Sequence, residues 1–357
     1  MSAVINALMQ RARATPDEIV LSWTDGALTA AELATQVSDL AALFAGDVSP
    51  VGVALDNGPA WVITDLALIL SGRPSVPIPP FFTASQRDHA LANAGAGLVA
   101  TVGDSDDDPR VPGGRIRLVS TGIAARPLHP GTAKITYTSG STGAPKGVCL
   151  SQAQMEAVAG SLVRVLGRDR AGLHMPVLPL AVLLENVAGL YATLLAGGRY
   201  HAVGLAEAGM GEAFRPDFAR LLTAVAATGV TTLILVPELL RGLIAAQAAL
   251  RLDHRLEMIA VGGARVSPAL LVAAAAAGLP VVEGYGLSEC ASLVALNTPD
   301  DARPGTVARP LPPLTATPAD AGDIPVPPRP RLASVRRPGR PAVVATRAPG
   351  PFPTAAR

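Results

Sequence analysis

The chain has 357 residues, of which 49% are apolar, and its 29 Lys and Arg against 28 Asp and Glu leave a net charge of +1. This length allows about two domains with large cores, and the balanced charge with only 3% aromatic residues argues against a nucleic-acid partner. The two cysteines lack metal-ligand spacing and no apolar run is long enough to cross a bilayer. We therefore expect a cytoplasmic protein without an integral membrane segment.

The elements expected in residues 1–169 alternate between strands and helices after a first amphipathic helix. Strands are predicted at 19–23, 51–55, 75–78 and 97–102, and a helix at 59–70. Two further helices begin at capping boxes, in which a hydroxyl residue is followed three positions later by Glu or Gln: Thr29 with Glu32, and Thr83 with Gln86. This alternation is typical of a largely parallel sheet with crossover helices.

Residues 138–147 form a loop between two short apolar runs. Its glycines let the backbone approach a ligand closely, and its hydroxyl and backbone N–H groups can donate to phosphate oxygens. Lys146 adds a mobile point charge suited to the outer phosphates. The loop is not a Walker A motif, because Lys146 precedes a glycine and a strand rather than Ser or Thr and a helix. We expect a triphosphate or pyrophosphate cradle formed by Thr138, Ser139, Gly140, Ser141, Thr142, Gly143 and Lys146.

A second alternating unit is expected in residues 170–310. Before this unit, Ser151 and Gln154 form a capping box that opens a helix to about residue 166. Within the unit, strands are predicted at 231–236, 256–261 and from 281 onward. We therefore predict an α/β fold of two layered subdomains, 1–169 and 170–310. Twelve of the 33 prolines fall in residues 311–357, where no apolar period survives, so this tail is predicted to be disordered.

A second candidate site follows the last predicted strand, at residues 283–289, because open α/β sheets bind ligands at the carboxyl ends of their strands. Tyr285 offers a flat face for a base and Ser288 a hydroxyl for phosphate. Glu289 offers a carboxylate oxygen, the type of ligand that Mg²⁺ prefers. A turn with an incidental acidic residue is the alternative. The glycine turn at 262–264 is a weaker signal of the same kind.

These two stretches together resemble motifs of the adenylate-forming superfamily, whose members include acyl-CoA synthetases, adenylation domains of peptide synthetases and luciferases. Residues 138–147 resemble its phosphate-binding signature, and 283–289 resemble its adenine and magnesium motif. Weaker matches lie at 178–186, 262–264 and 304–312. The segment 178–186 resembles the border of the acyl pocket in long-chain acyl-CoA synthetases. Val182 stands where that family often has histidine, and a helical core is an equally good interpretation.

The resemblance implies an AMP-forming acid–thiol ligase that uses ATP, Mg²⁺ and CoA, or another thiol carrier, and for which a fatty acid is the expected substrate. Lys146 and Glu289 would then be catalytic residues, with Glu289 also the Mg²⁺ ligand. The resemblance adds Ser288 to the ATP-binding residues of the loop. It assigns the adenine pocket to Gly263, Ala264, Tyr285 and Gly286.

The resemblance covers about residues 5–312 and implies the N-terminal portion of such an enzyme. Family members carry a later ribose-binding aspartate and a small C-terminal domain with a lysine that acts in adenylation. This sequence has no lysine after Lys146, and arginine is not equivalent, because its planar fork positions charge differently. The alternative function is therefore a catalytically inactive nucleotide- or acyl-binding remnant.

Overall fold

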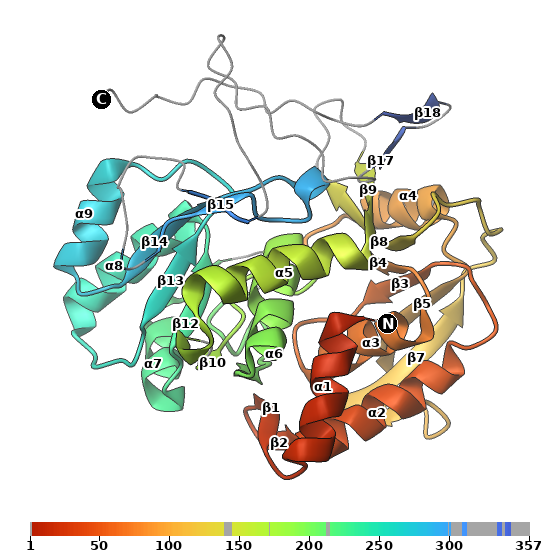
Figure 1. Ribbon diagram of the computed structural model, residues 1–357, viewed down its shortest axis with the longest axis horizontal. Helices are drawn as coiled ribbons and strands as arrows, with labels where there is room; N and C mark the ends of the chain where they lie inside the picture. Colours follow the sequence, from red (N-terminus) through yellow and green to blue (C-terminus); the bar gives the residue numbers. More distant parts are fainter. Residues whose placement is uncertain are drawn as a thin grey trace.

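The computed structural model describes residues 2–138, 145–170, 172–211, 215–298, 300 and 309–312, together with the backbone of 334–337 and 340–343. Within these residues, two mixed β-sheets and their helices form the α/β fold that the sequence predicts (Figure 1). The buried apolar side chains form three clusters, and the largest of them includes residues from both sheets and from several helices.

The first sheet has the strand order β18-β17-β9-β8-β4-β3-β5-β7-β6, and its centre is parallel. The central strand β3 is buried on both faces, which explains its continuous apolar sequence. The strands are β3 (Val51–Ala54), β4 (Ser75–Pro77), β5 (Leu98–Gly103), β6 (Arg110–Val111), β7 (Gly114–Ser120), β8 (Thr132–Thr138), β9 (Lys146–Ser151), β17 (Ser334–Arg337) and β18 (Arg340–Val343). The helices of this half are α1 (Ala3–Ala14), α2 (Ala30–Leu43), α3 (Pro59–Ser71), α4 (Ala84–Ala94) and α5 (Gln152–Leu166).

The second sheet has the strand order β16-β15-β14-β13-β12-β10-β11-β1-β2, and its six central strands are parallel. The strands are β1 (Ile19–Trp23), β2 (Gly26–Thr29), β10 (Leu173–His174), β11 (Arg199–His201), β12 (Thr232–Leu235), β13 (Met258–Val261), β14 (Val281–Tyr285), β15 (Ala295–Leu296) and β16 (Arg309–Pro310). One face is covered by α7 (Phe218–Thr228), α8 (Pro237–Leu250) and α9 (Pro268–Ala276). The other face is covered by α5, the π-helix η2 (Leu184–Tyr191) and α6 (Ala192–Ala196). Two 3₁₀ turns, η1 (Arg168–Arg170) and η4 (Ser288–Cys290), complete this half.

The predicted helix starts at Thr29, Thr83 and Ser151 are confirmed. Each hydroxyl accepts a hydrogen bond from the backbone N–H three residues later, and the Glu or Gln at that position accepts one from the cap in return. Such a box satisfies two N–H groups that the first helical turn leaves without partners. Local sequence therefore determines where these helices begin.

The expected boundary near residue 170 does not separate the two sheets. β1 and β2 come from the first 30 residues, yet β1 pairs in parallel with β11, and Leu21 lies opposite Tyr200. Val20 and Leu21 are fully buried there. This long-range pairing covers an edge of the second sheet, and a local sequence pattern does not show it.

The disordered tail stays a prediction, and only its first two residues are described with their side chains. Leu311 is 1% exposed within the shared core, and the Ser161 hydroxyl donates to the Pro312 carbonyl. Further on, the backbone of β17 pairs antiparallel with β9. Leu311 and Pro312 therefore pack against the folded part of the chain.

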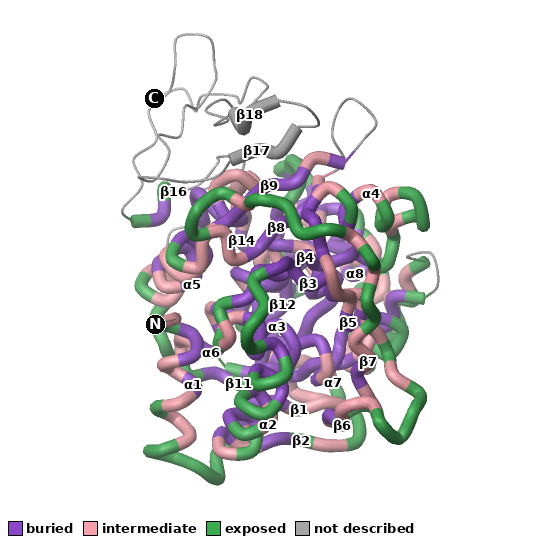
Figure 2. Tube along the Cα trace, turned by 90° about the vertical axis from the view of Figure 1, so that its right-hand side faces the viewer, coloured by how far each residue is buried: buried purple, intermediate pink, exposed green. Residues whose placement is uncertain are grey.

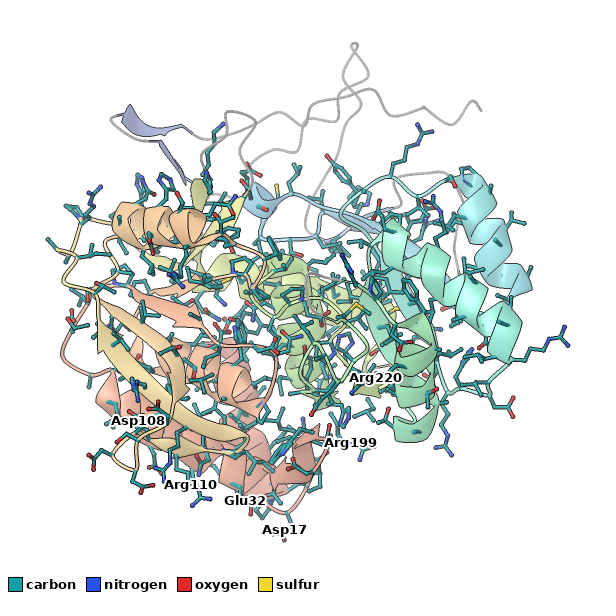
Figure 3. All side chains as sticks on the ribbon, turned by 180° about the vertical axis from the view of Figure 1, so that it is seen from behind. Asp17, Glu32, Asp108, Arg110, Arg199 and Arg220 are labelled. Carbon is teal, nitrogen blue, oxygen red and sulfur yellow. The ribbon has the colours of Figure 1, made fainter. Side chains whose placement is uncertain are left out.

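Buried residues follow the strands and the inner helix faces (Figure 2), and the connecting segment at 175–181 is buried as well. Charged side chains such as Asp17, Glu32 and Arg220 lie on the surface (Figure 3). None of the helices in the described part of the chain is both long and apolar enough to cross a membrane. The cytoplasmic location stays a prediction.

A fully buried ion pair ties the first sheet to the π-helix. Lys134 on β8 donates to the Asp65 carboxylate at 2.7 Å and to the side-chain oxygen of Asn186. Tyr191 donates to the other Asp65 oxygen at 2.6 Å. Burial lowers the pKa of Lys134, while Asp65 opposes that shift. The pair is fully hydrogen-bonded, as a buried charge must be.

Candidate active site

The ends of the predicted phosphate loop lie at the tip of the β8–β9 hairpin. Thr138 and Lys146 are paired across this hairpin, and both side chains are partly exposed. The expected ligand residues Ser139, Gly140, Ser141, Thr142 and Gly143 lie outside the described residues. The structure thus places the lysine and the threonine at the base of the loop, on a rigid two-stranded support.

A histidine that the sequence analysis did not assign holds the far end of this loop. His89 on α4 lies with Nε2 3.1 Å from the Pro145 carbonyl oxygen and packs edge-on against Tyr137. The Tyr137 hydroxyl donates to the Asn93 side chain at 2.7 Å. Gly147 leaves room for the Tyr137 ring, since a Cβ there would lie 3.0 Å from it. The helix α4 therefore fixes the strand on which Lys146 stands.

The second predicted motif lies directly beside this hairpin. Tyr285 ends β14, and the short turn η4 carries Ser288 and Glu289 and contacts β9 (the blue turn beside β9 in Figure 1). Burial raises the pKa of Tyr285, and Cys290 adds to that shift, so its hydroxyl stays protonated at neutral pH. Two motifs that are about 140 residues apart in the sequence thus meet at one place.

Gly286 must be glycine for this turn to form, because a Cβ would overlap the Ser292 carbonyl. The neighbouring glycine turn follows β13, which pairs in parallel with β14. There, a Cβ on Gly262 would lie 3.2 Å from the Gly284 carbonyl oxygen, and Gly263 has φ +82°. Gly263 and Ala264 are exposed. The two turns therefore form adjacent glycine-rich edges at the carboxyl end of the second sheet.

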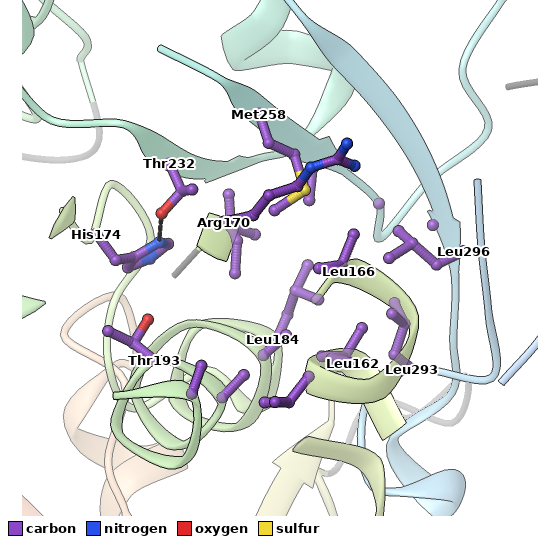
Figure 4. Close-up of a pocket in the computed structure, with 18 of the residues that line it drawn as sticks. Leu162, Leu166, Arg170, His174, Leu184, Thr193, Thr232, Met258, Leu293 and Leu296 are labelled. Carbon is purple, nitrogen blue, oxygen red and sulfur yellow. Dashed lines mark hydrogen bonds between the residues drawn. The ribbon is translucent and has the colours of Figure 1, made fainter. Parts of the chain in front are cut away.

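An apolar pocket lies behind this edge, between α5, η2, α6 and the inner face of the second sheet (Figure 4). Its volume is about 60 Å³, and its lining includes Leu162, Leu166, Leu184, Ile234, Met258 and Leu293. Gly262 and Gly284 line it at the carboxyl end of the strands. The segment 178–186 contributes both to this pocket, through Leu184, and to the buried core, through Glu185 and Asn186. Its assignment as the border of an acyl site stays a prediction.

Polar side chains gather at the opposite end of the pocket, which sequence reasoning missed. His174 places Nδ1 2.9 Å from the Thr232 hydroxyl and Nε2 2.8 Å from a Glu185 carboxylate oxygen. The Tyr200 hydroxyl donates to the same carboxylate oxygen at 3.2 Å. Burial and the Glu185 carboxylate raise the pKa of Tyr200 well above its usual range, so Tyr200 remains a donor. The residues come from three strands and one helix, and no local pattern could have grouped them.

The described residues suit a magnesium ion shared with a nucleotide better than a metal held by protein alone. They contain no group of three or more His, Cys, Asp or Glu that could form a complete cage. Mg²⁺ usually binds one or two carboxylates together with substrate phosphates and water. Glu289, partly exposed and adjacent to β9, provides one such carboxylate.

Comparison with known proteins identifies the family to which the chain is similar. Residues 8–331 match the family described as AMP-binding enzyme. The chain is 25% identical over 310 residues to one plipastatin synthase subunit of Bacillus subtilis (strain 168), which is 80% of this chain and 12% of that protein. It is 30% identical over 301 residues to feruloyl-CoA synthase of Amycolatopsis sp, which is 79% of this chain and 59% of that protein. It is also 30% identical over 261 residues to CymA of Salinispora arenicola (strain CNS-205), described as a probable non-canonical nonribosomal peptide synthetase, which is 71% of this chain and 3% of that protein.

Among solved structures, the anthranilate CoA ligase AuaEII in complex with anthranoyl-AMP has a similar fold, with a TM-score of 0.77. The two share 17% sequence identity, over 94% of this chain and 70% of that chain. At this identity the likeness concerns the fold alone. The chain spans less than two thirds of the length of each of the three curated relatives, from 3% to 59%.

Proposed function

The chain belongs to the family of AMP-binding enzymes, and we propose that it activates a carboxylic acid with ATP as an acyl adenylate and transfers the acyl group to CoA. The observation that carries this proposal is the contact between the strand of Lys146 and the turn of Glu289. The strand β14, which precedes that turn, borders the apolar pocket through Gly284. The predicted superfamily is confirmed by the family match, whereas the closer resemblance to long-chain acyl-CoA synthetases stays a prediction.

The proposed reaction proceeds in two steps. A carboxylate oxygen of the acid attacks the α-phosphorus of ATP, the bond from that phosphorus to the oxygen that bridges to the β-phosphate breaks, and pyrophosphate leaves. A thiolate of CoA then attacks the acyl carbon, and AMP leaves with the electron pair of the broken C–O bond.

Lys146 would stabilise negative charge on the phosphates by position rather than by covalent chemistry. Bound Mg²⁺, held by Glu289, would neutralise the charge of the leaving pyrophosphate. Tyr285 would stack on the adenine beside Gly263, Ala264 and Gly286, and Thr138 and Ser288 would contact phosphate.

Transfer to CoA is supported by the names of two similar proteins, feruloyl-CoA synthase and an anthranilate CoA ligase. Similarity to a probable nonribosomal peptide synthetase favours a second candidate, the activation of an amino acid. An α-amino group would lie beside the carboxylate, at the end of the pocket lined by Leu184, Gly262 and Gly284. These residues offer no negative charge to an ammonium group, so an acid without an α-amino group is the better substrate. A fatty acid stays a prediction.

The test is ATP–pyrophosphate exchange by the purified chain, with Mg²⁺ and a panel of carboxylic acids. We expect exchange that depends on one class of acid and falls by about 10²–10³-fold in Lys146→Ala and in Glu289→Gln, since both groups act on charge that develops in the reaction. Arg241→Ala and Glu238→Gln are matched controls, because both side chains are exposed on α8.

The alternative, a catalytically inactive remnant, predicts a different result. Folded protein would then show no exchange with any acid, although ATP would still bind. Exchange that survives Lys146→Ala unchanged would contradict the role assigned to that lysine.

A further inference from the structure

We propose that the acid substrate carries a hydrogen-bond donor, a hydroxyl or amino group, at the end remote from its carboxylate, and that Thr232 and Thr193 receive it. This inference rests on the proposed function, because it assigns the substrate class of the same pocket. It follows from the uneven distribution of polar groups along that pocket.

The two ends of the pocket differ in chemistry. Met258, Ala260 and Val261 of β13 line it, and so does Gly262, which directly follows the strand. Four residues of strand span about 13 Å. A small molecule of this length can therefore reach from the glycine edge to the start of the strands. The middle of the pocket is apolar. A substrate that reaches the glycine edge with its carboxylate therefore places its other end among His174, Thr232 and Thr193.

The hydrogen bonds at this end determine which kind of group is accepted. The Glu185 carboxylate faces His174 Nε2 at 2.8 Å and so keeps a proton on that nitrogen. In the neutral tautomer with that proton, His174 Nδ1 is an acceptor for the Thr232 hydroxyl, 2.9 Å away. The Thr232 oxygen is left with lone pairs only. A group that binds it from the pocket must therefore donate a hydrogen bond.

A second hydroxyl lies at the same end of the pocket. The Thr193 hydroxyl, on α6, points into the pocket opposite His174 (Figure 4). The polar end of the pocket thus offers two hydroxyl oxygens, those of Thr232 and Thr193, as hydrogen-bond acceptors.

A distal carboxylate fits less well. Arg170 also lines the pocket, but its guanidinium already donates to both Asp300 carboxylate oxygens, at 2.9 and 3.1 Å. Its charge is therefore already paired within the chain and is not available to a substrate anion. A neutral donor is therefore preferred to an anion.

The experiment compares three acids that share the cinnamic acid skeleton and differ only at the 4-position: 4-hydroxycinnamic acid, its 4-methyl ether and unsubstituted cinnamic acid. The methyl ether keeps the oxygen but cannot donate. In ATP–pyrophosphate exchange we expect kcat/KM for the hydroxy acid to exceed the other two by about 10–100-fold, since a site that hydrogen-bonds a substrate group rejects analogues without it. In Thr232→Val and Thr193→Val this preference falls at least several-fold, through KM rather than kcat. Thr223→Val, exposed on α7, is the matched control.

The outcomes separate this inference from the proposed function. Exchange with all three acids at equal kcat/KM, or a preference that both variants retain, overturns the inference and leaves adenylate formation intact. If no acid supports exchange, the proposed function fails. Calorimetric titration of the hydroxy acid and its methyl ether then tests the pocket alone. Selective binding of the hydroxy acid, weakened in Thr193→Val, supports the inference, and equal or absent binding overturns it.

Discussion

Lys134 is one of only two lysines in the sequence and the only one of the two that is fully buried. Its ammonium group contacts Asp65 and Asn186 and lies 5.7 Å from the Trp61 ring centre. An ion pair of this kind adds little net stability compared with apolar residues, yet removing one partner leaves the other charge buried alone. Its role is therefore to define how β8 sits against α3 and the π-helix.

We expect Lys134→Met to lower the free energy of unfolding by about 3–5 kcal/mol. The double variant Lys134→Met with Asp65→Asn should recover a large part of that loss, since no uncompensated charge remains. Urea unfolding of both variants measures the difference. Equal stability of the single and double variants would contradict this account.

His201 links stability to pH at the junction of β1 and β11. It is 8% exposed, and Ser22 Oγ lies 2.9 Å from its Nδ1. Burial lowers the pKa of His201, while the Glu207 carboxylate opposes the shift. The unfolded chain therefore binds more protons than the folded chain between the folded-state pKa and the ordinary value near 6.5. Stability contributed by His201 is present above that window and is lost as the pH falls through it.

We expect the free energy of unfolding to decrease between about pH 7.5 and about pH 5.5, and the decrease to be smaller in His201→Asn. Urea titrations of both proteins at the two pH values measure this. An identical change in both proteins would show that other groups cause it.

At the scale of elements, the π-helix η2 is the feature that joins the pocket to the core. Its first three residues have different neighbours. Leu184 lines the pocket, Glu185 contacts His174, and Asn186 accepts a hydrogen bond from Lys134. Local π-helical geometry is rare and often marks functional sites. Gly189 allows this arrangement, since a Cβ would overlap a Glu185 oxygen and lie 2.9 Å from His174 Nε2.

Gly189→Ala should therefore destabilise the protein by about 1–3 kcal/mol, although alanine is the better helix former. Gly160→Ala in α5 is the matched control. A Cβ there meets only the end of Arg164, 3.7 Å away, so that change should stabilise by about 0.5–1 kcal/mol. Thermal unfolding of both variants provides the measurement, and a stabilised Gly189→Ala would refute the packing argument.

For the whole molecule, one shared core joins the two sheets. It includes side chains from α1, α2 and α3, from α5 and the π-helix, and from Leu311. Asn57 adds a polar link, accepting from the Leu180 N–H at 2.7 Å and donating to the Leu178 carbonyl at 2.9 Å. The two halves therefore form one packed body whose site lies where the sheets approach each other.

Leu311→Ala should lower the free energy of unfolding by about 2–4 kcal/mol, although the residue lies in the proline-rich stretch. Leu43→Ala on α2 is the control, because that side chain is 51% exposed and should lose much less. Chemical denaturation of both variants tests this. A neutral Leu311→Ala would contradict the packing of this side chain in the shared core.

The sequence by itself determined the α/β class, the capped helix starts at Thr29, Thr83 and Ser151, and the two motifs around Lys146 and Glu289. These features depend on neighbours within a few positions, where hydrogen bonding and backbone geometry leave a clear pattern. Only the tertiary structure decided that β1 joins the second sheet, that Leu311 enters the core, and that His174, Glu185 and Thr232 meet at the end of the pocket. Such contacts join segments far apart in the chain, and their free energy depends on burial and packing, which one sequence does not reveal.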